Sequence, residues 1–357
     1  MTRPLLARIH PAALAHNLEV ARRRAPGCPI MAVVKANAYG HGLLRAASAL
    51  ARADAFAVLE IEGAVRLREA GHDQDIVLLE GIFDASELSL VEQHRLALVV
   101  HQAEQVAILE GARIRHKLRV FLKVNSGMNR LGFALGEVRS VLARLQNCAA
   151  VSEVVLMTHF ANADDERGVD WQLERFRSLD ASRMLPLSLA NSAALLRFPE
   201  TRAGWVRPGL MLYGASPFAD ETAEALALLP AMTLESRIIA VQDLEPGARV
   251  GYGGTFTAQT AMRIGIVACG YADGYPRQAP TGTPILVDGR RTRTVGRVSM
   301  DTLYVDLTPV PGAGVGARVV PWGRGMPVEE VAAAAGTVSY VLLCGLAPRV
   351  RTEVADG

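Results

Sequence analysis

Lysine is scarce in this chain of 357 residues. The 38 basic residues include only three lysines, Lys35, Lys117 and Lys123, so the other 35 are arginines. Arginine stays protonated in proteins, whereas a lysine amine can lose its proton, form an imine with an aldehyde or accept carbon dioxide as a carbamate. Lys35 ends an apolar run and precedes a turn with two glycines. The lysines, and Lys35 first among them, are therefore the candidates for amine chemistry.

Excess charge of either sign is also absent, because 36 acidic residues leave a formal charge of only +2. This balance excludes a strongly basic surface of the kind that binds nucleic acid or anionic membranes. No apolar run reaches the length of a transmembrane helix, and Arg3 and Pro4 interrupt the beginning of the chain before a signal-peptide core forms. We therefore predict a cytoplasmic protein with neither a nucleic-acid nor a membrane partner.

Cysteine is rare and dispersed. Cys28, Cys148, Cys269 and Cys344 form no CxxC pair, which favours reduced, buried thiols over disulfides. All eight histidines lie at or before His159, and none belongs to an HExxH motif or a His/Cys cluster. The sequence thus predicts no metal site built by the protein.

Short β-rich runs alternate with segments of helical periodicity from residue 30 to residue 207. The predicted strands are residues 30–35, 55–59, 76–80, 96–101, 119–124, 151–159, 186–191 and 205–207. Amphipathic segments such as 64–70, 85–94, 137–145 and 171–179 lie between them. Strands and helices that alternate in this way predict a (β/α)₈ TIM barrel. A doubly wound sheet is the alternative, but no GxGxxG follows the first strand.

The pattern changes after residue 228, where short strands separated by Gly, Pro and Asp dominate. The predicted strands there are residues 267–270, 285–288, 293–298, 303–307 and 318–322, with 328–335 as the only predicted helix. We expect a mostly β C-terminal domain. The extended segment 4–10 fits either domain, and we assign residues 1–10 as a strand joining the C-terminal domain, 11–228 to the barrel and 229–357 to the C-terminal domain.

Polar residues follow the predicted barrel strands. Because active sites of such barrels form at the C-terminal ends of the strands, these residues are expected to converge. They are Lys35, Tyr39, Lys123, Arg130, His159, Asn191, Ser192, Arg207 and Gly209. For each residue alone the alternative is an ordinary polar strand end, but the set together predicts a functional site.

Six segments of the chain closely resemble the conserved motifs of alanine racemases, in order and in both domains. The first, around Lys35, resembles the pyridoxal-phosphate attachment site of that family. The segments are residues 32–42, 123–132, 207–214, 250–253, 270–274 and 296–301.

The resemblance implies an enzyme that interconverts L-alanine and D-alanine with pyridoxal 5′-phosphate, attached covalently to Lys35. It also implies that Tyr39, Ser192 and the amides of Gly209 and Leu210 bind the phosphate, that His159 lies against the ring and that Arg207 faces the pyridine nitrogen. Arg130 would contact both cofactor and substrate carboxylate.

The resemblance further implies a head-to-tail homodimer with shared active sites. Tyr252, Tyr271, Met300 and Asp301 would complete the site of the partner subunit, with Met300, Tyr271 and Asp301 near the substrate. Two bases on opposite faces invert a carbon, and the family assigns Lys35 to the D enantiomer and Tyr252 to the L enantiomer.

Two features of the motifs lead to further expectations. We predict that Lys123 carries a carbamate, since a free ammonium there would repel Arg130; the alternative is a lysine paired with an acidic neighbour. Many relatives have a phosphate-binding tyrosine near the C-terminus, but residues 344–349 have alanine and proline where we expect it.

Three rival functions remain. They are a racemase of broader or different amino-acid specificity, a decarboxylase of the same fold, and a non-catalytic pyridoxal-phosphate carrier. Known carriers of the last kind lack a second domain. The physiological direction, D-alanine supply for peptidoglycan or D-alanine catabolism, stays open.

Overall fold

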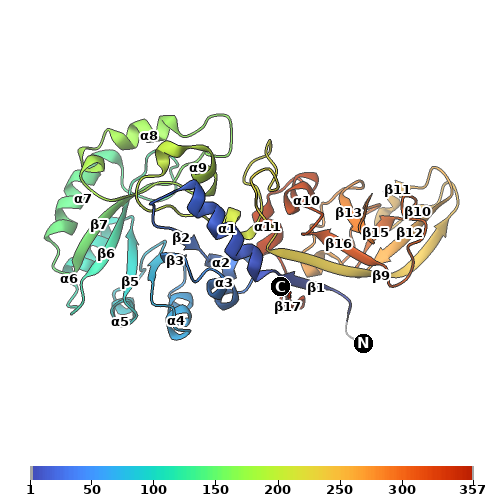
Figure 1. Ribbon diagram of the computed structural model, residues 1–357, viewed down its shortest axis with the longest axis horizontal. Helices are drawn as coiled ribbons and strands as arrows, with labels where there is room; N and C mark the ends of the chain where they lie inside the picture. Colours follow the sequence, from blue (N-terminus) through green and yellow to red (C-terminus); the bar gives the residue numbers. More distant parts are fainter. Residues whose placement is uncertain (1–2, 356–357) are drawn as a thin grey trace.

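The computed structural model describes residues 3–355, and the outermost positions of the predicted domains, 1–2 and 356–357, lie outside that range. The molecule is elongated, with a parallel barrel at one end and a mostly β unit at the other (Figure 1). Within residues 3–355, no helix combines the length and apolar character needed to span a membrane.

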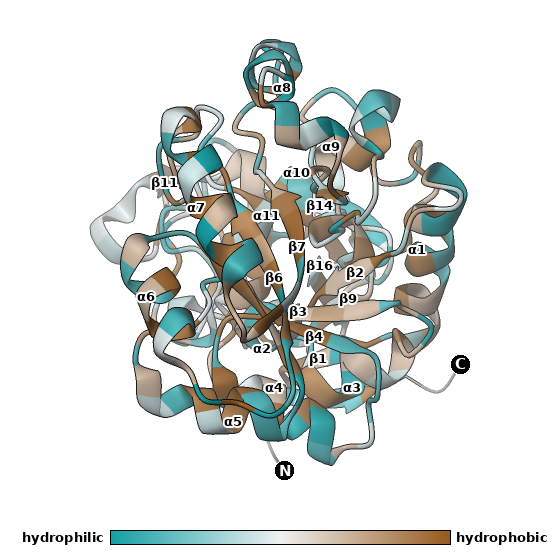
Figure 2. Cartoon of the chain, turned by 90° about the vertical axis from the view of Figure 1, so that its left-hand side faces the viewer, coloured by the Kyte–Doolittle hydropathy of each residue, from teal (hydrophilic) through white to brown (hydrophobic). Residues whose placement is uncertain are grey.

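The barrel consists of seven parallel strands joined in sequence order. They are β2 (Met31–Val33), β3 (Ala55–Val58), β4 (Asp75–Leu78), β5 (Leu96–Val100), β6 (Leu118–Lys123), β7 (Val151–Met157) and β8 (Leu187–Ser188). Strands such as β3 and β5 are buried along their whole length, as expected for a parallel sheet covered on both faces. The strands form the apolar centre in Figure 2, and helices surround them.

One of the surrounding helices precedes β2, two follow it, and one follows each later barrel strand. They are α1 (Pro11–Arg24), α2 (Lys35–Tyr39), α3 (Leu43–Ala49), α4 (Ile61–Glu69), α5 (Leu88–Gln93), α6 (Ala103–Gly111), α7 (Leu135–Asn147), α8 (Asp170–Arg177) and α9 (Ser192–Arg197). The helical periodicity at 64–70, 85–94, 137–145 and 171–179 corresponds to α4, α5 with a preceding 3₁₀ turn, α7 and α8.

The predicted eighth strand, residues 205–207, forms only isolated bridges and no continuous strand. Isolated parallel bridges join Trp205 to Ser188 and Val206 to Ile30, so this segment closes the ring between the last strand and the first. Arg207 lies beyond it. Pro208 follows Arg207 and has no N–H to donate, which limits a longer ladder. The barrel prediction is confirmed, with its eighth position reduced to two bridges.

The C-terminal unit is built on an eight-stranded sheet. Its strands are β1 (Leu6–Ile9), β9 (Met232–Leu244), β12 (Met262–Val267), β13 (Pro284–Val287), β14 (Arg290–Arg293), β15 (Leu303–Asp306), β16 (Arg318–Trp322) and β17 (Arg351–Val354). A small hairpin joins β10 (Arg249–Val250) to β11 (Phe256–Thr257). β1 lies between β9 and β17, so both ends of the chain contribute strands to this sheet (Figure 1).

Several predicted elements of this unit were wrong in detail. The long strand β9 was missed, because polar residues such as Thr233 and Ser236 interrupt its apolar alternation although both are buried. Residues 268–270 and 295–298 are not strands. Two helices are present, α10 (Val328–Ala334) and α11 (Ser339–Cys344), and the second was not expected.

Candidate active site

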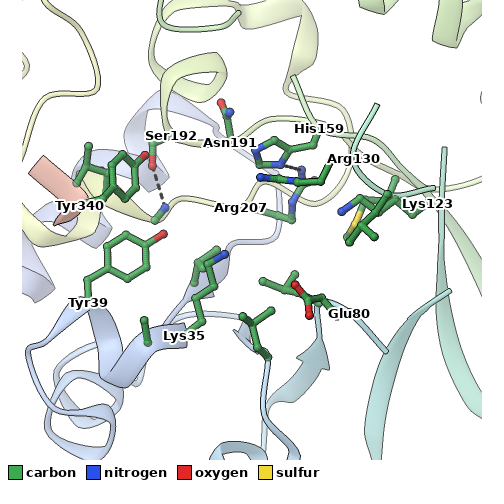
Figure 3. A pocket seen from close by; sticks show the side chains of 18 of the residues that line it. Lys35, Tyr39, Glu80, Lys123, Arg130, His159, Asn191, Ser192, Arg207 and Tyr340 are labelled. Carbon is green, nitrogen blue, oxygen red and sulfur yellow. Dashed lines mark hydrogen bonds between the residues drawn. The ribbon is translucent and has the colours of Figure 1, made fainter. Parts of the chain in front are cut away.

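A cavity of about 400 Å³ opens at the C-terminal ends of the barrel strands. This volume is in the range of small-molecule sites. Figure 3 shows the labelled side chains converging on it from segments far apart in the sequence. Its lining includes ten predicted site residues, namely Lys35, Tyr39, Lys123, Arg130, His159, Asn191, Ser192, Arg207, Gly209 and Leu210.

The four predicted residues of the C-terminal unit do not reach this cavity. Tyr252, Met300 and Asp301 lie together around a separate surface hollow. The exposed fraction is 73% for Tyr252 and 53% for Met300. Tyr271 lies beside them, because its amide donates a hydrogen bond to the carbonyl of Ser299 at 3.0 Å. One chain therefore carries two clusters of predicted site residues that do not meet.

Lys35 begins an unusual left-handed turn. β2 ends at Val33, so the predicted strand 30–35 is two residues too long at this end. Ala36, Asn37, Ala38 and Tyr39 have φ values of 52°, 52°, 53° and 49°. For residues with a side chain, left-handed backbone costs about 1–2 kcal/mol each, so surrounding contacts must hold this turn. The turn directs Lys35 and Tyr39 into the same cavity (Figure 3).

Hydroxyl and amide groups gather at one end of the cavity. The amide of Gly209 donates to Ser192 Oγ at 2.8 Å, which leaves the serine hydroxyl hydrogen available to another acceptor. A Cβ added to Gly209 would lie 2.7 Å from the Tyr39 hydroxyl, so only glycine permits this approach. These donors suit an anion such as a phosphate.

Tyr340 of α11 lies at the same end and was not predicted. Its ring is 5.6 Å from that of Tyr39, and it lines the cavity with Cys344. Burial raises the pKa of Tyr340 to about 12, so its hydroxyl stays a hydrogen-bond donor. Residues 344–349 contain no tyrosine, as the sequence analysis noted, and no motif drew attention to Tyr340, because the helix that carries it was not expected.

Four cationic side chains border the cavity: Lys35, Lys123, Arg130 and Arg207. Burial first, and then the charges of Arg207 and Arg130, lower the pKa of Lys123 to about 8. Burial and Arg130 also lower the pKa of Lys35, while Glu80 raises it. Glu80, two residues after β4, is the one carboxylate among the described lining residues, and the sequence analysis overlooked it. The site thus has an excess of positive charge and suits an anionic ligand.

Arg207 is held rigidly at the base of the cavity. It donates to Ser188 Oγ at 2.8 Å and to the carbonyl oxygens of Thr158 at 2.7 Å and Leu189 at 3.2 Å. Its Nη2 also lies 3.5 Å from Nδ1 of His159, which must accept because guanidinium nitrogens only donate. Burial and the nearby Arg207 lower the pKa of His159 well below 6.5, so its ring is neutral.

The hollow around Tyr252 is supported by an ion-pair network. Asp273, which is fully buried, accepts from Nε of Arg349 at 2.7 Å and also pairs with Arg3. Nη2 of Arg349 continues to Asp301 at 2.6 Å. This network joins the turn that carries Tyr271 to the loop that carries Met300, so the second cluster has a defined geometry although it is exposed.

Both parts of the chain match known protein families. The profile described as "Alanine racemase, N-terminal domain" matches residues 9–217, and "Alanine racemase, C-terminal domain" matches residues 231–354. An alanine racemase of Nitrosospira multiformis is 60% identical over 354 residues, which is 98% of this chain and 99% of the relative. A catabolic alanine racemase of Klebsiella aerogenes is 52% identical over 351 residues, with 98% and 99% covered.

Solved structures agree with these sequence matches. The biosynthetic alanine racemase from Pseudomonas aeruginosa has a TM-score of 0.95 and 46% identity, covering 99% of this chain and all of the other. The alanine racemase from Acinetobacter baumannii gives a TM-score of 0.93 and 39% identity, with 99% and 100% covered. This chain belongs to the alanine racemase family.

Proposed function

We propose that this protein interconverts L-alanine and D-alanine with pyridoxal 5′-phosphate as cofactor. The observation that carries the proposal is the convergence on one cavity of the barrel of Lys35, Arg207 and hydroxyl and amide donors that could bind a phosphate. Membership of the alanine racemase family supports the reaction and the cofactor together.

The lining of the cavity fits pyridoxal phosphate. The phosphate would be held by Tyr39, Ser192, Tyr340 and the amides of Gly209 and Leu210. The Lys35 amine would attach the cofactor. When bound, the cofactor supplies an electron-accepting ring that eases removal of the α proton of an amino acid. Once the amino group of the substrate has replaced the Lys35 amine on the cofactor, Lys35 would have a free amine beside that proton, and its lowered pKa suits a base.

Arg207 would favour racemisation over competing outcomes. Its pKa is lowered by burial to about 10, so the guanidinium remains charged at neutral pH. A guanidinium offers the pyridine nitrogen a hydrogen bond without protonating it, which leaves the ring a weaker electron acceptor. The proton then returns to the α carbon. A decarboxylase of the same fold would have a carboxylate at this position.

The second base would come from another copy of the chain. Tyr252, Met300 and Asp301 lie exposed and apart from the cavity of their own chain. A head-to-tail homodimer would place Tyr252 of the partner subunit opposite Lys35, with the partner's Met300, Tyr271 and Asp301 near the substrate. Val338 and Val341, more than half exposed beside the cavity residue Tyr340, offer apolar surface for such contact.

A carbamate on Lys123 is part of this proposal. Lys123 has no ion-pair partner within residues 3–355, although the charge of Glu80 raises its pKa, and this disfavours the alternative of a lysine paired with an acidic neighbour. A carbamate would replace one of four clustered positive charges with an anion that accepts hydrogen bonds from Arg130.

The decisive experiment is a racemisation assay. Purified protein loaded with pyridoxal phosphate is incubated with each L-amino acid in deuterated water, and products are separated on a chiral column. We expect D-alanine labelled at the α carbon. Faster turnover of another amino acid would favour a racemase of different specificity. If no amino acid exchanges its α proton with the solvent, the non-catalytic carrier is favoured.

A further inference from the structure

The left-handed turn that carries Lys35 and Tyr39 depends on a buried histidine outside the cavity. His41 is completely buried, and its Nδ1 lies 3.0 Å from the carbonyl oxygen of Ala38 and 2.8 Å from that of Tyr39. A carbonyl oxygen can only accept, so Nδ1 carries the hydrogen and donates to both. These two carbonyls belong to residues with left-handed backbone angles.

The protonation state of His41 agrees with this role. Burial lowers its pKa to about 4, and the nearby Arg45 acts in the same direction. Arg45 Nη1 donates to the carbonyl oxygen of His41 at 2.9 Å, which anchors the backbone of the histidine. Nε2 has no hydrogen-bond partner within residues 3–355 and therefore keeps its lone pair. At neutral pH, His41 is a neutral donor through a single nitrogen.

An aromatic stack connects His41 to Tyr39. The ring of Tyr213 lies 4.7 Å from that of His41 and 4.5 Å from that of Tyr39, and it is nearly parallel to Tyr39 at 19°. The Tyr213 hydroxyl donates to the carbonyl oxygen of Val33 at 2.8 Å, at the end of β2. His41 and Tyr213 thus hold both the backbone and the ring of Tyr39.

We propose that His41, supported by Tyr213, is a positioning residue that aims the Tyr39 hydroxyl at the cofactor phosphate. This inference rests on the proposed function. Without the Nδ1 donor, two carbonyls of the left-handed turn lose a buried hydrogen bond, and the turn relaxes toward ordinary backbone angles. Tyr39 then moves away from Gly209 and Ser192.

The test compares variants of the apoprotein for binding of pyridoxal phosphate, measured by the change in protein fluorescence. His41→Leu removes the Nδ1–H donor, whereas His41→Asn keeps an N–H donor bonded to Cγ, as Nδ1 is. We expect the dissociation constant to rise about tenfold in His41→Leu, because buried hydrogen bonds are lost, and His41→Asn to restore most of the affinity. His10→Leu is the matched control, since His10 is buried but bonds Thr233 instead of the turn.

A double-mutant cycle separates positioning from general destabilisation. If His41 acts through Tyr39, His41→Leu should raise the dissociation constant little further in a Tyr39→Phe background. Full additivity of the two changes would overturn the proposal, as would equal affinities of His41→Leu and the unchanged protein. Should His41→Leu not fold, Tyr213→Phe replaces it with the same expectation of a non-additive loss.

The outcome also distinguishes this inference from the proposed function. If the unchanged protein takes up no pyridoxal phosphate, the cofactor assignment fails. If it binds the cofactor and racemises alanine but the variants at position 41 bind equally well, only the positioning role fails.

Discussion

The two clusters of predicted site residues differ in how firmly the chain itself holds them. In the barrel cavity, Arg207 makes four hydrogen bonds to its own domain, and Tyr39 is stacked and buried. In the C-terminal unit, Tyr252 has 73% of its surface exposed. The cavity is preorganised within one chain, whereas the other cluster needs a second surface to be buried. We therefore expect changes in the barrel to affect cofactor binding and changes at Tyr252 to affect only proton transfer.

The largest effect is expected at Lys35. Lys35→Ala removes the amine that we propose attaches the cofactor and serves as one base, so racemisation should fall by about 10⁴-fold or more. Visible absorbance of the attached cofactor should disappear as well. Lys117→Ala is the control, because Lys117 is exposed and outside the cavity. A borohydride-reducible adduct that persists at Lys117 or Lys123 would show that the cofactor is attached to that lysine and not to Lys35.

A smaller loss, with the cofactor retained, is expected at Tyr252. Tyr252→Phe removes the hydroxyl that we propose acts as the second base, so racemisation should fall by about 10³-fold in both directions. Exchange of the D-alanine α proton with solvent, which uses Lys35, should survive better than exchange of the L-alanine proton, as followed by proton NMR. The affinity for pyridoxal phosphate should not change. Equal loss of the two exchange rates would contradict bases on opposite faces.

Arg207 tests whether the barrel cluster also directs the outcome of the reaction. Arg207→Glu should lower racemisation by about 10²-fold and raise the fraction of turnovers that end in transamination, detected as pyruvate. A carboxylate at this position faces the carbonyl oxygens of Thr158 and Leu189, so the thermal midpoint should fall too. Arg207→Gln keeps N–H donors and serves as the stability control. An unchanged ratio of pyruvate to racemised alanine would refute this role.

The smallest effect is expected at Lys123 and depends on pH. Carbon dioxide reacts with the neutral amine, and the pKa of Lys123 is lowered to about 8. A carbamate signal from ¹³C-bicarbonate in NMR spectra should therefore grow as the pH rises through 8, and Lys123→Ala should lack it. The variant should lose about tenfold in activity, partly restored by acetate, because hydrogen bonds to Arg130 are lost. Active protein without this signal would exclude the carbamate.

The lowered pKa of Lys123 also predicts whether the stability of the apoprotein rises or falls with pH when bicarbonate is absent. Folding lowers the pKa of Lys123, so the unfolded chain binds more protons between about pH 8 and the usual value of 10.5. The contribution of Lys123 to the free energy of unfolding should rise across this window and be most unfavourable below pH 8. Lys123→Met should reduce the rise of the free energy of unfolding with pH in this window, as measured by urea unfolding.

Much of the site was predictable from local sequence. Lys35, His159 and Arg207 each follow a β-rich run, and the C-terminal ends of parallel strands meet at one end of a barrel. Elements with clear periodicity, such as α4 and β5, were predicted within a few residues. The strand β9 was not, because burial of its polar residues depends on neighbouring strands that are distant in sequence.

The sequence by itself determined the alternation of strands and helices, the charge balance and the kinds of side chain available for chemistry, because these follow from residue type and spacing. Only the tertiary structure decided that Tyr340 and Glu80 reach the cavity and that residues 36–39 wind to the left. Left-handed backbone is unfavourable for these residues locally, and contacts with His41 and Tyr213 make it stable. The contacts of Tyr213 join segments more than 150 residues apart, and no local pattern encodes them.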